Sequence, residues 1–157
     1  SIGIVFSNDK HEARVAENIR AYGLAGRVAA TARMDVAKLT DLEAAFSPGP
    51  VRDSVLAQFH KAAEDCVARG AEVVIPAVGV AMVLLFEAGV HETARGAPVL
   101  CGPLALVQQG QAAVKLKGAM GGRFTSRRGA YGQPPPAQIA ELRRYYGAIY
   151  PGINAPQ

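Results

Sequence analysis

An almost uninterrupted apolar run over 73–90, with a single charged residue, is the feature that most constrains the fold. The run is about as long as a minimal transmembrane helix, but Pro76 and Gly79 interrupt it. Its first part, 73–77, is short and rich in β-branched residues, which indicates a strand covered on both faces. We therefore expect a buried strand, then a helix over about 80–95, and no membrane-spanning segment.

Similar short apolar segments alternate with helical patterns along the rest of the chain. The other expected strands are 2–6, 27–34 and 97–101. The other helices are expected between 9 and 23 and over 51–69 and 104–117. Four strands alternating with helices predict an α/β fold with a parallel, doubly wound sheet in the flavodoxin-like order 2-1-3-4. A chain of 157 residues with 50% hydrophobic content is long enough for one such domain, which we place at 1–118.

The composition changes at about residue 119. The segment 119–157 is a Gly/Pro-rich basic arm that leads to a helix expected over 137–146. Residues 115–157 carry seven Lys and Arg against one Glu, a net charge of +6, which leaves −2 for residues 1–114. Because the basic character is confined to the arm, a basic groove along the domain is not expected, and neither is a nucleic-acid partner.

The two cysteines lie in different expected elements. Cys66 is on the apolar stripe of the helix 51–69, so we expect it in the core, and His60 beside that stripe is expected to be structural. Neither a metal site nor a disulfide framework is suggested, because the cysteines have no CxxC or Cys/His spacing. The first residues lack the basic start and the cleavage pattern of a secretion signal, so a reducing cytoplasm is the expected location.

Candidate ligand-binding residues follow the first and third expected strands. Ser7 and Asn8 come directly after the first strand, and Val78, Gly79 and Val80 come after the third. Ligands of parallel α/β sheets bind at the carboxyl ends of the strands, where backbone N–H groups at a helix start can hold a carboxylate. For Ser7 and Asn8, ordinary helix capping is an equally open interpretation.

Cys101 is the candidate catalytic residue. It ends the fourth expected strand and precedes Gly102 and a helix, whose dipole can favour the thiolate. We expect Cys101, rather than Cys66, to be the exposed and reactive thiol. The alternative is that Cys101 is a small buried hydrophobic residue.

Four segments carry a family resemblance. They are the Gly-Ala-Glu-Val-Val-Ile strand with its Val-Gly-Val-Ala-Met turn, the Ala-Pro-Val-Leu strand, the Ala-Ala-Val-Lys-Leu helix and the Thr-Ser-Arg-Arg-Gly-Ala-Tyr segment of the arm. Together they resemble the C-terminal half and tail of the Asp/Glu/hydantoin racemase superfamily. In that family two stacked α/β domains enclose a site where two cysteines exchange a Cα proton without any cofactor.

The resemblance implies an isomerase of the racemase type, or a related decarboxylase, that acts on a small carboxylate, an amino acid or a hydantoin without a cofactor or metal. The position after the third strand, where the resemblance would place a cysteine, holds Val78, and Cys101 is the thiol that can reach the same edge. Two alternatives stay open. One is a degenerate, non-catalytic relative that binds a small carboxylate or a partner chain; the other is an interaction protein that acts through the arm 121–157.

The apolar helix expected over 80–95 indicates that this domain packs against another surface. Its apolar residues cover more than one helical face, whereas a surface helix needs only one apolar stripe. Something else must cover the remainder. We expect a neighbouring subunit of a homo-oligomer, an N-terminal half that is missing from this sequence, or the C-terminal arm to cover it.

Overall fold

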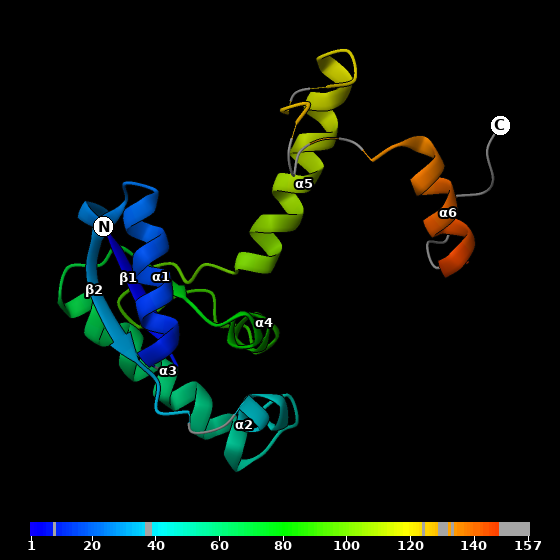
Figure 1. Ribbon diagram of the computed structural model, residues 1–157. Coiled ribbons are helices and arrows are strands. Elements are labelled where there is room, and N and C mark those ends of the chain that lie inside the picture. Colours follow the sequence, from blue (N-terminus) through cyan, green and yellow to red (C-terminus); the bar gives the residue numbers. More distant parts are fainter. Residues whose placement is uncertain (8, 37–38, 124, 129–131, 133, 148–157) are drawn as a thin grey trace. The chain divides into compact units, whose positions relative to one another are not determined.

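A three-stranded parallel sheet forms the centre of the fold (Figure 1). The computed structural model describes residues 1–7, 9–36, 39–123, 125–128, 132 and 134–147. The strands are β1 (Ile2–Phe6), β2 (Val28–Arg33) and β3 (Val73–Pro76), in the spatial order β2-β1-β3. Ile4 of β1 is aligned with Thr31 of β2 and with Ile75 of β3. The expected α/β class and the three parallel strands are therefore confirmed.

Six α-helices and one 3₁₀ helix are found among the described residues. They are α1 (Asp9–Ala21), η1 (Ala25–Arg27), α2 (Leu39–Ala44), α3 (Pro50–Ala68), α4 (Gly79–Glu87), α5 (Gly102–Ala119) and α6 (Pro136–Tyr146). The chain forms two compact units, residues 1–111 and 112–157, and the division falls inside α5. The expected domain boundary after Gly118 stays a prediction.

Helix α3 packs across all three strands and supplies one side of the core. Its apolar stripe is buried as expected, with Phe59 and Cys66 fully enclosed. The aliphatic and aromatic side chains of β1 are enclosed from both faces of the sheet, since Ile4, Val5 and Phe6 are all buried. His60 lies on the exposed side of α3, where its ring meets that of Phe59 edge-on at 6.0 Å.

The fourth expected strand, 97–101, does not form. Val99 makes only an isolated parallel bridge to Val74, and Pro98 makes an antiparallel bridge to Glu92. The N–H of Val74 donates to the carbonyl of Pro98 at 2.9 Å, and the N–H of Leu100 donates to the carbonyl of Val74 at 2.9 Å. A longer ladder is prevented because Pro98 has no N–H and because the segment turns back toward residue 92.

The helix expected over 80–95 is also shorter than predicted. α4 ends at Glu87, and Gly89 follows with φ of 75°, a left-handed conformation that ends helices and that glycine adopts without strain. Beyond it, the N–H of Thr93 donates to the carbonyl of Ala97 at 2.9 Å, closing a second turn. The carboxylate of Glu64 on α3 accepts from the N–H of Ala94 at 2.7 Å, which fixes this turn to the core.

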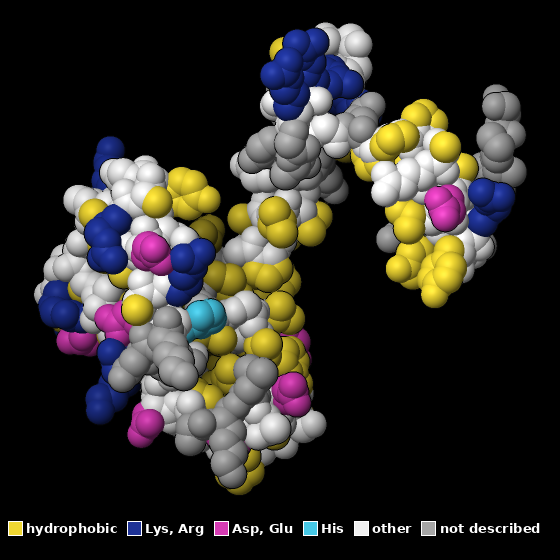
Figure 2. All heavy atoms as spheres, in the orientation of Figure 1, with side chains coloured by type: hydrophobic (Ala, Val, Ile, Leu, Met, Phe, Trp, Pro, Cys, Tyr) yellow, Lys and Arg dark blue, Asp and Glu magenta, His cyan; other side chains and the backbone are white. Residues whose placement is uncertain are grey.

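Large hydrophobic side chains remain exposed on α4 and α5. Phe86 of α4 is 45% exposed, and α5 has no buried residue along its whole length. Figure 2 shows hydrophobic side chains gathered over α4 and the first half of α5, whereas charged side chains are spread over the face around α1. Among the described residues, none of the helices combines the length and the apolar character needed to cross a membrane.

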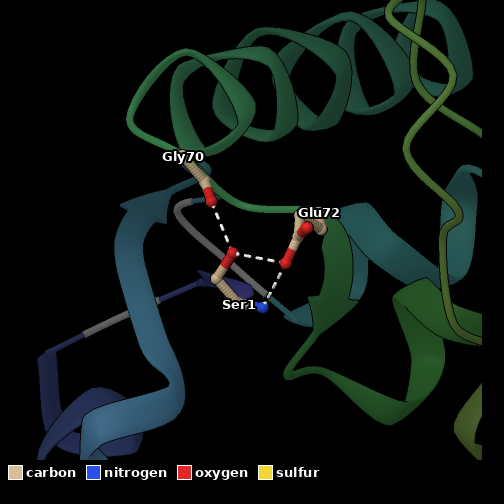
Figure 3. Close-up of polar contacts among 3 residues, drawn as sticks. All are labelled: Ser1, Gly70 and Glu72. Carbon is tan, nitrogen blue, oxygen red and sulfur yellow. Dashed lines mark hydrogen bonds and ion pairs between the residues drawn. The ribbon is translucent and has the colours of Figure 1, made fainter.

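Ser1 connects the start of β1 to the segment that leads into β3 (Figure 3). The Ser1 ammonium lies 2.6 Å from the Glu72 carboxylate, and the Ser1 hydroxyl donates to the carbonyl of Gly70 at 2.6 Å. Hydrogen bonds from the ammonium and the hydroxyl of Ser1 hold the pKa of the Glu72 carboxyl below its ordinary value. These contacts close the amino end of the sheet.

In a chain that begins at Ser1, Glu72→Gln is expected to lower the thermal unfolding midpoint at neutral pH. A lowered folded-state pKa adds stability that is complete above the unfolded pKa, near 4.5, and is lost as the pH falls through the folded value. The deficit should therefore shrink on acidification. Unfolding monitored by circular dichroism over a pH series measures it, with Glu92→Gln as the control. A deficit that is equal in acid and at neutral pH would contradict the assignment.

Candidate functional site

The carboxyl edge of the sheet brings two of the predicted segments together. The N–H of Ala77 donates to the carbonyl of Val5 at 2.8 Å, so the chain after β3 stays beside β1. Val5 is aligned with Pro76, the last residue of β3, so Ser7 and Val78 both follow the strands at this edge of the sheet. Ser7 is half-buried, whereas Asn8 lies outside the described residues.

The turn from β3 into α4 is formed largely by backbone groups. Val78 is extended and 6% exposed, and its carbonyl accepts the first helical hydrogen bond, from the N–H of Met82 at 3.0 Å. Because Val78 has no side-chain oxygen, the first N–H groups of α4 have no side-chain cap. Val80 is half-buried. The turn therefore presents backbone donors at the carboxyl end of β3, an edge strand of the sheet.

Gly79 is not required by the backbone geometry. Its φ is not positive, and a Cβ built on it meets no atom within 4 Å. The backbone of Gly79 is exposed, which leaves open space beside it.

Cys101 lies in a different part of this edge, where it lines a small cavity with His91. The cavity measures about 10 Å³, which is room for about one water molecule. Its lining residues are Pro76, Met82, Leu85, Phe86, Val90, His91, Val99, Leu100 and Cys101. Pro76 links the cavity to the end of β3, but Ser7, Val78, Gly79 and Val80 do not line it.

Backbone hydrogen bonds and a ring contact position Cys101 and His91, the two side chains of the cavity that can transfer a proton. The N–H of Val99 donates to the carbonyl of His91 at 2.8 Å, and the N–H of Ala105 donates to the carbonyl of Cys101 at 3.0 Å. The ring of Phe86 meets the imidazole of His91 edge-on with centroids 5.4 Å apart. A thiol and an imidazole, both capable of proton transfer, therefore share one cavity at the end of β3.

His91 was missed from the sequence. The expected helix over 80–95 placed it inside a helix, and the actual chain reversal at Gly89 brings it back toward Val99. A usable signal was present, because Gly89 follows the last apolar turn of α4 and is typical of a helix end.

The other cysteine is enclosed in the core. Cys66 is 0% exposed, and its thiol lies 3.9 Å from the carbonyl oxygen of Ile4. Burial raises the pKa of the Cys66 thiol above its ordinary value. Cys101 is half-buried instead. The predicted difference in exposure between the two cysteines is confirmed, and the reactivity of Cys101 stays a prediction.

A larger polar groove lies between β2 and α3. It measures about 300 Å³ and is lined by Ala32, Arg33, Asp35, Gln58, Lys61, Ala62 and Asp65. Its charges are balanced, and two of them form ion pairs, Arg33 with Glu12 at 2.6 Å and Asp65 with Arg69 at 2.8 Å. Lys61 is exposed on the rim. The groove therefore has no net charge among its lining residues.

No cluster of three or more His, Cys, Asp or Glu residues suited to a metal ion is found in the part of the chain that the structure describes. Comparison with known proteins identifies no relative: no protein-family model, no curated protein and no solved structure matches this chain.

Proposed function

We propose that this protein transfers a proton at the carbon acid of a small carboxylate, amino acid or hydantoin without a cofactor, in the manner of a racemase or isomerase. Cys101 is the proposed thiol acid/base, and His91 is the second proton-transfer group. The observation that carries the proposal is the placement of both side chains on one cavity at the end of β3. The resemblance of the β3–α4 segment to the racemase superfamily supports the same chemistry.

The proposed reaction needs two groups on opposite faces of the substrate carbon. One of them, as thiolate or neutral imidazole, removes the Cα proton, and the electron pair of the C–H bond moves into the adjacent carbonyl. The other, as thiol or imidazolium, returns a proton from the opposite face. The product differs from the substrate only in configuration or proton position, so no oxidant or other co-reactant is consumed.

The substrate carboxylate is assigned to the turn after β3. The N–H groups at the start of α4, including those of Gly79 and Val80, have no side-chain cap and can donate hydrogen bonds to an anion. Ser7 adds a hydroxyl at the same edge. A substrate larger than water must displace part of the cavity wall.

A second candidate function is binding without turnover. Val78 occupies the turn where the resemblance would place a catalytic cysteine, and a valine cannot carry a proton. Cys66 cannot replace it, because it is fully enclosed behind β1. A chain with one accessible thiol can keep the carboxylate site while lacking the reaction. Both candidates are proposed for a reducing compartment such as the cytoplasm, where the two free thiols stay reduced.

Deuterium exchange at the substrate Cα distinguishes the two functions. The protein is incubated in D₂O with aspartate, glutamate and a 5-substituted hydantoin, and loss of the Cα proton signal is followed by NMR. We expect exchange with at least one of them, and a fall of about 100-fold or more in Cys101→Ser and His91→Asn, because positioned acid/base groups contribute about 10²–10⁴-fold.

The exposed His60→Asn variant is the matched control and should exchange at the wild-type rate. Exchange that persists in Cys101→Ser would contradict the catalytic proposal. Binding detected by calorimetry in the absence of exchange would favour the non-catalytic function.

A further inference from the structure

Five exposed hydrophobic side chains form one surface that begins on α4 and continues onto α5. This apolar patch consists of Val83, Phe86, Leu100, Leu104 and Val107, which are 43%, 45%, 41%, 45% and 58% exposed. Val83 and Phe86 are three residues apart and share one face of α4. Leu100 lines the same cavity as Phe86, which joins the α4 part of the patch to the chain entering α5.

The start of α5 lies directly against α4. A Cβ built on Gly102 would fall 2.7 Å from the sulfur of Met82, so the Met82 side chain of α4 packs against the backbone at the start of α5. Leu104 and Val107 then follow at a spacing of three residues on one face of α5. Hydrophobic side chains gather over both of these elements, as Figure 2 shows.

Charged side chains are absent from the sequence that builds the patch. Residues 79–86 and 97–114 contain no Asp, Glu, Lys or Arg. Glu87, at the end of α4, lies 2.8 Å from the guanidinium of Arg52, so its charge is compensated on the side of α3. In a symmetric dimer each surface meets an identical copy of itself, so a charged surface would face like charges. An uncharged surface avoids this repulsion.

The size of the patch also fits a second copy. The exposed parts of its five side chains amount to roughly 400 Å² of apolar surface, at the scale of the largest patches on monomeric proteins. A standard interface buries about 800 Å² on each partner, of which about 56–65% is apolar. The patch therefore supplies most of the apolar surface that one face of a stable dimer needs.

We propose that the apolar patch is the interface between two copies of this chain, paired face to face as a closed dimer. Phe86 and Leu100 belong both to the patch and to the wall of the cavity that holds Cys101 and His91. The second copy would therefore border this cavity. The inference rests on the exposure and charge of the patch, and it holds whether or not the protein is an enzyme.

Light scattering coupled to size-exclusion chromatography tests the proposal over a concentration series. We expect the wild-type chain, 16.4 kDa, to elute at twice its monomer mass. The double variant Leu104→Glu/Val107→Glu should elute at the monomer mass with an unchanged circular dichroism spectrum, because neither side chain is buried within its own chain. Val83→Glu tests the α4 part of the patch independently.

Tyr22→Glu is the matched control, since Tyr22 is 79% exposed at the end of α1, outside the patch. It should remain dimeric. A wild-type chain that is a folded monomer at every concentration, or a dimer that survives both patch variants, would overturn the proposal. A mass that keeps growing with concentration would also overturn it, because a closed dimer has no free interface left.

Discussion

Gly3→Ala is expected to destabilise the fold severely, although the change adds one methyl group. A Cβ at this position would lie 2.6 Å from the Cβ of Cys66 and 2.9 Å from the Cβ of Ala71. Both neighbours are held directly by their backbones, so neither can rotate away, and β1 must move from α3. Overpacking of this kind costs about 1–3 kcal/mol or more, out of a total stability of about 5–15 kcal/mol.

Urea unfolding measures the loss, and Gly26→Ala is the matched control. A Cβ on Gly26 meets no atom within 4 Å, and its φ is not positive. We expect that variant to equal the wild type or to exceed it slightly, because alanine restricts the unfolded chain more than glycine does. If Gly3→Ala unfolded within about 0.5 kcal/mol of the wild type, the close approach of β1 and α3 would be wrong.

The two cysteines should differ at least about 100-fold in their rate of alkylation in the native protein. Cys66 is fully enclosed, so it reacts only when the core opens, and opening costs a free energy close to that of global unfolding. Its raised pKa further lowers the thiolate fraction at neutral pH. Cys101 is half-buried and needs no such opening.

Iodoacetamide labelling at neutral pH, followed by peptide mapping, measures both rates in one sample. The same sample unfolded in urea is the control, and there the two cysteines should react at similar rates. Preferential alkylation of Cys66 in the native protein would show that Cys101 is not the accessible thiol.

The strands β1 and β3 could be predicted because their local pattern and their burial agree. Residues 2–6 and 73–76 are short apolar segments bounded by turn residues; β1 is almost fully buried, and Val74 and Pro76 of β3 are buried. The segment 97–101 has the same local pattern, yet it makes a single bridge to Val74. Whether such a segment extends a ladder depends on Pro98 and on the return of the chain from Glu92, which are properties of the tertiary fold.

The candidate site was predictable only in part, because it too depends on contacts between segments that are distant in the sequence. Cys101 could be placed at the end of its segment from the sequence alone, and so could the turn after β3. The proximity of His91 to Cys101 could not, because it depends on the helix ending at Glu87 and on the turn that Glu64 fixes to α3. The exposure of α5 could not be predicted either. The apolar residues of a helix indicate that it can be covered, but they do not show whether its own chain covers it.

The proposed function needs a small carboxylate to bind at the turn after β3 within reach of Cys101, and protection of this thiol by a ligand tests that most directly. The alkylation rate of Cys101 is measured with and without aspartate, glutamate, succinate and a hydantoin. We expect at least one of them to slow the reaction, and we expect the protection to persist in Lys61→Ala, which removes the cation at the rim of the polar groove. An alkylation rate that is unchanged with all four compounds, or protection that disappears in Lys61→Ala, would contradict a carboxylate site at the turn after β3.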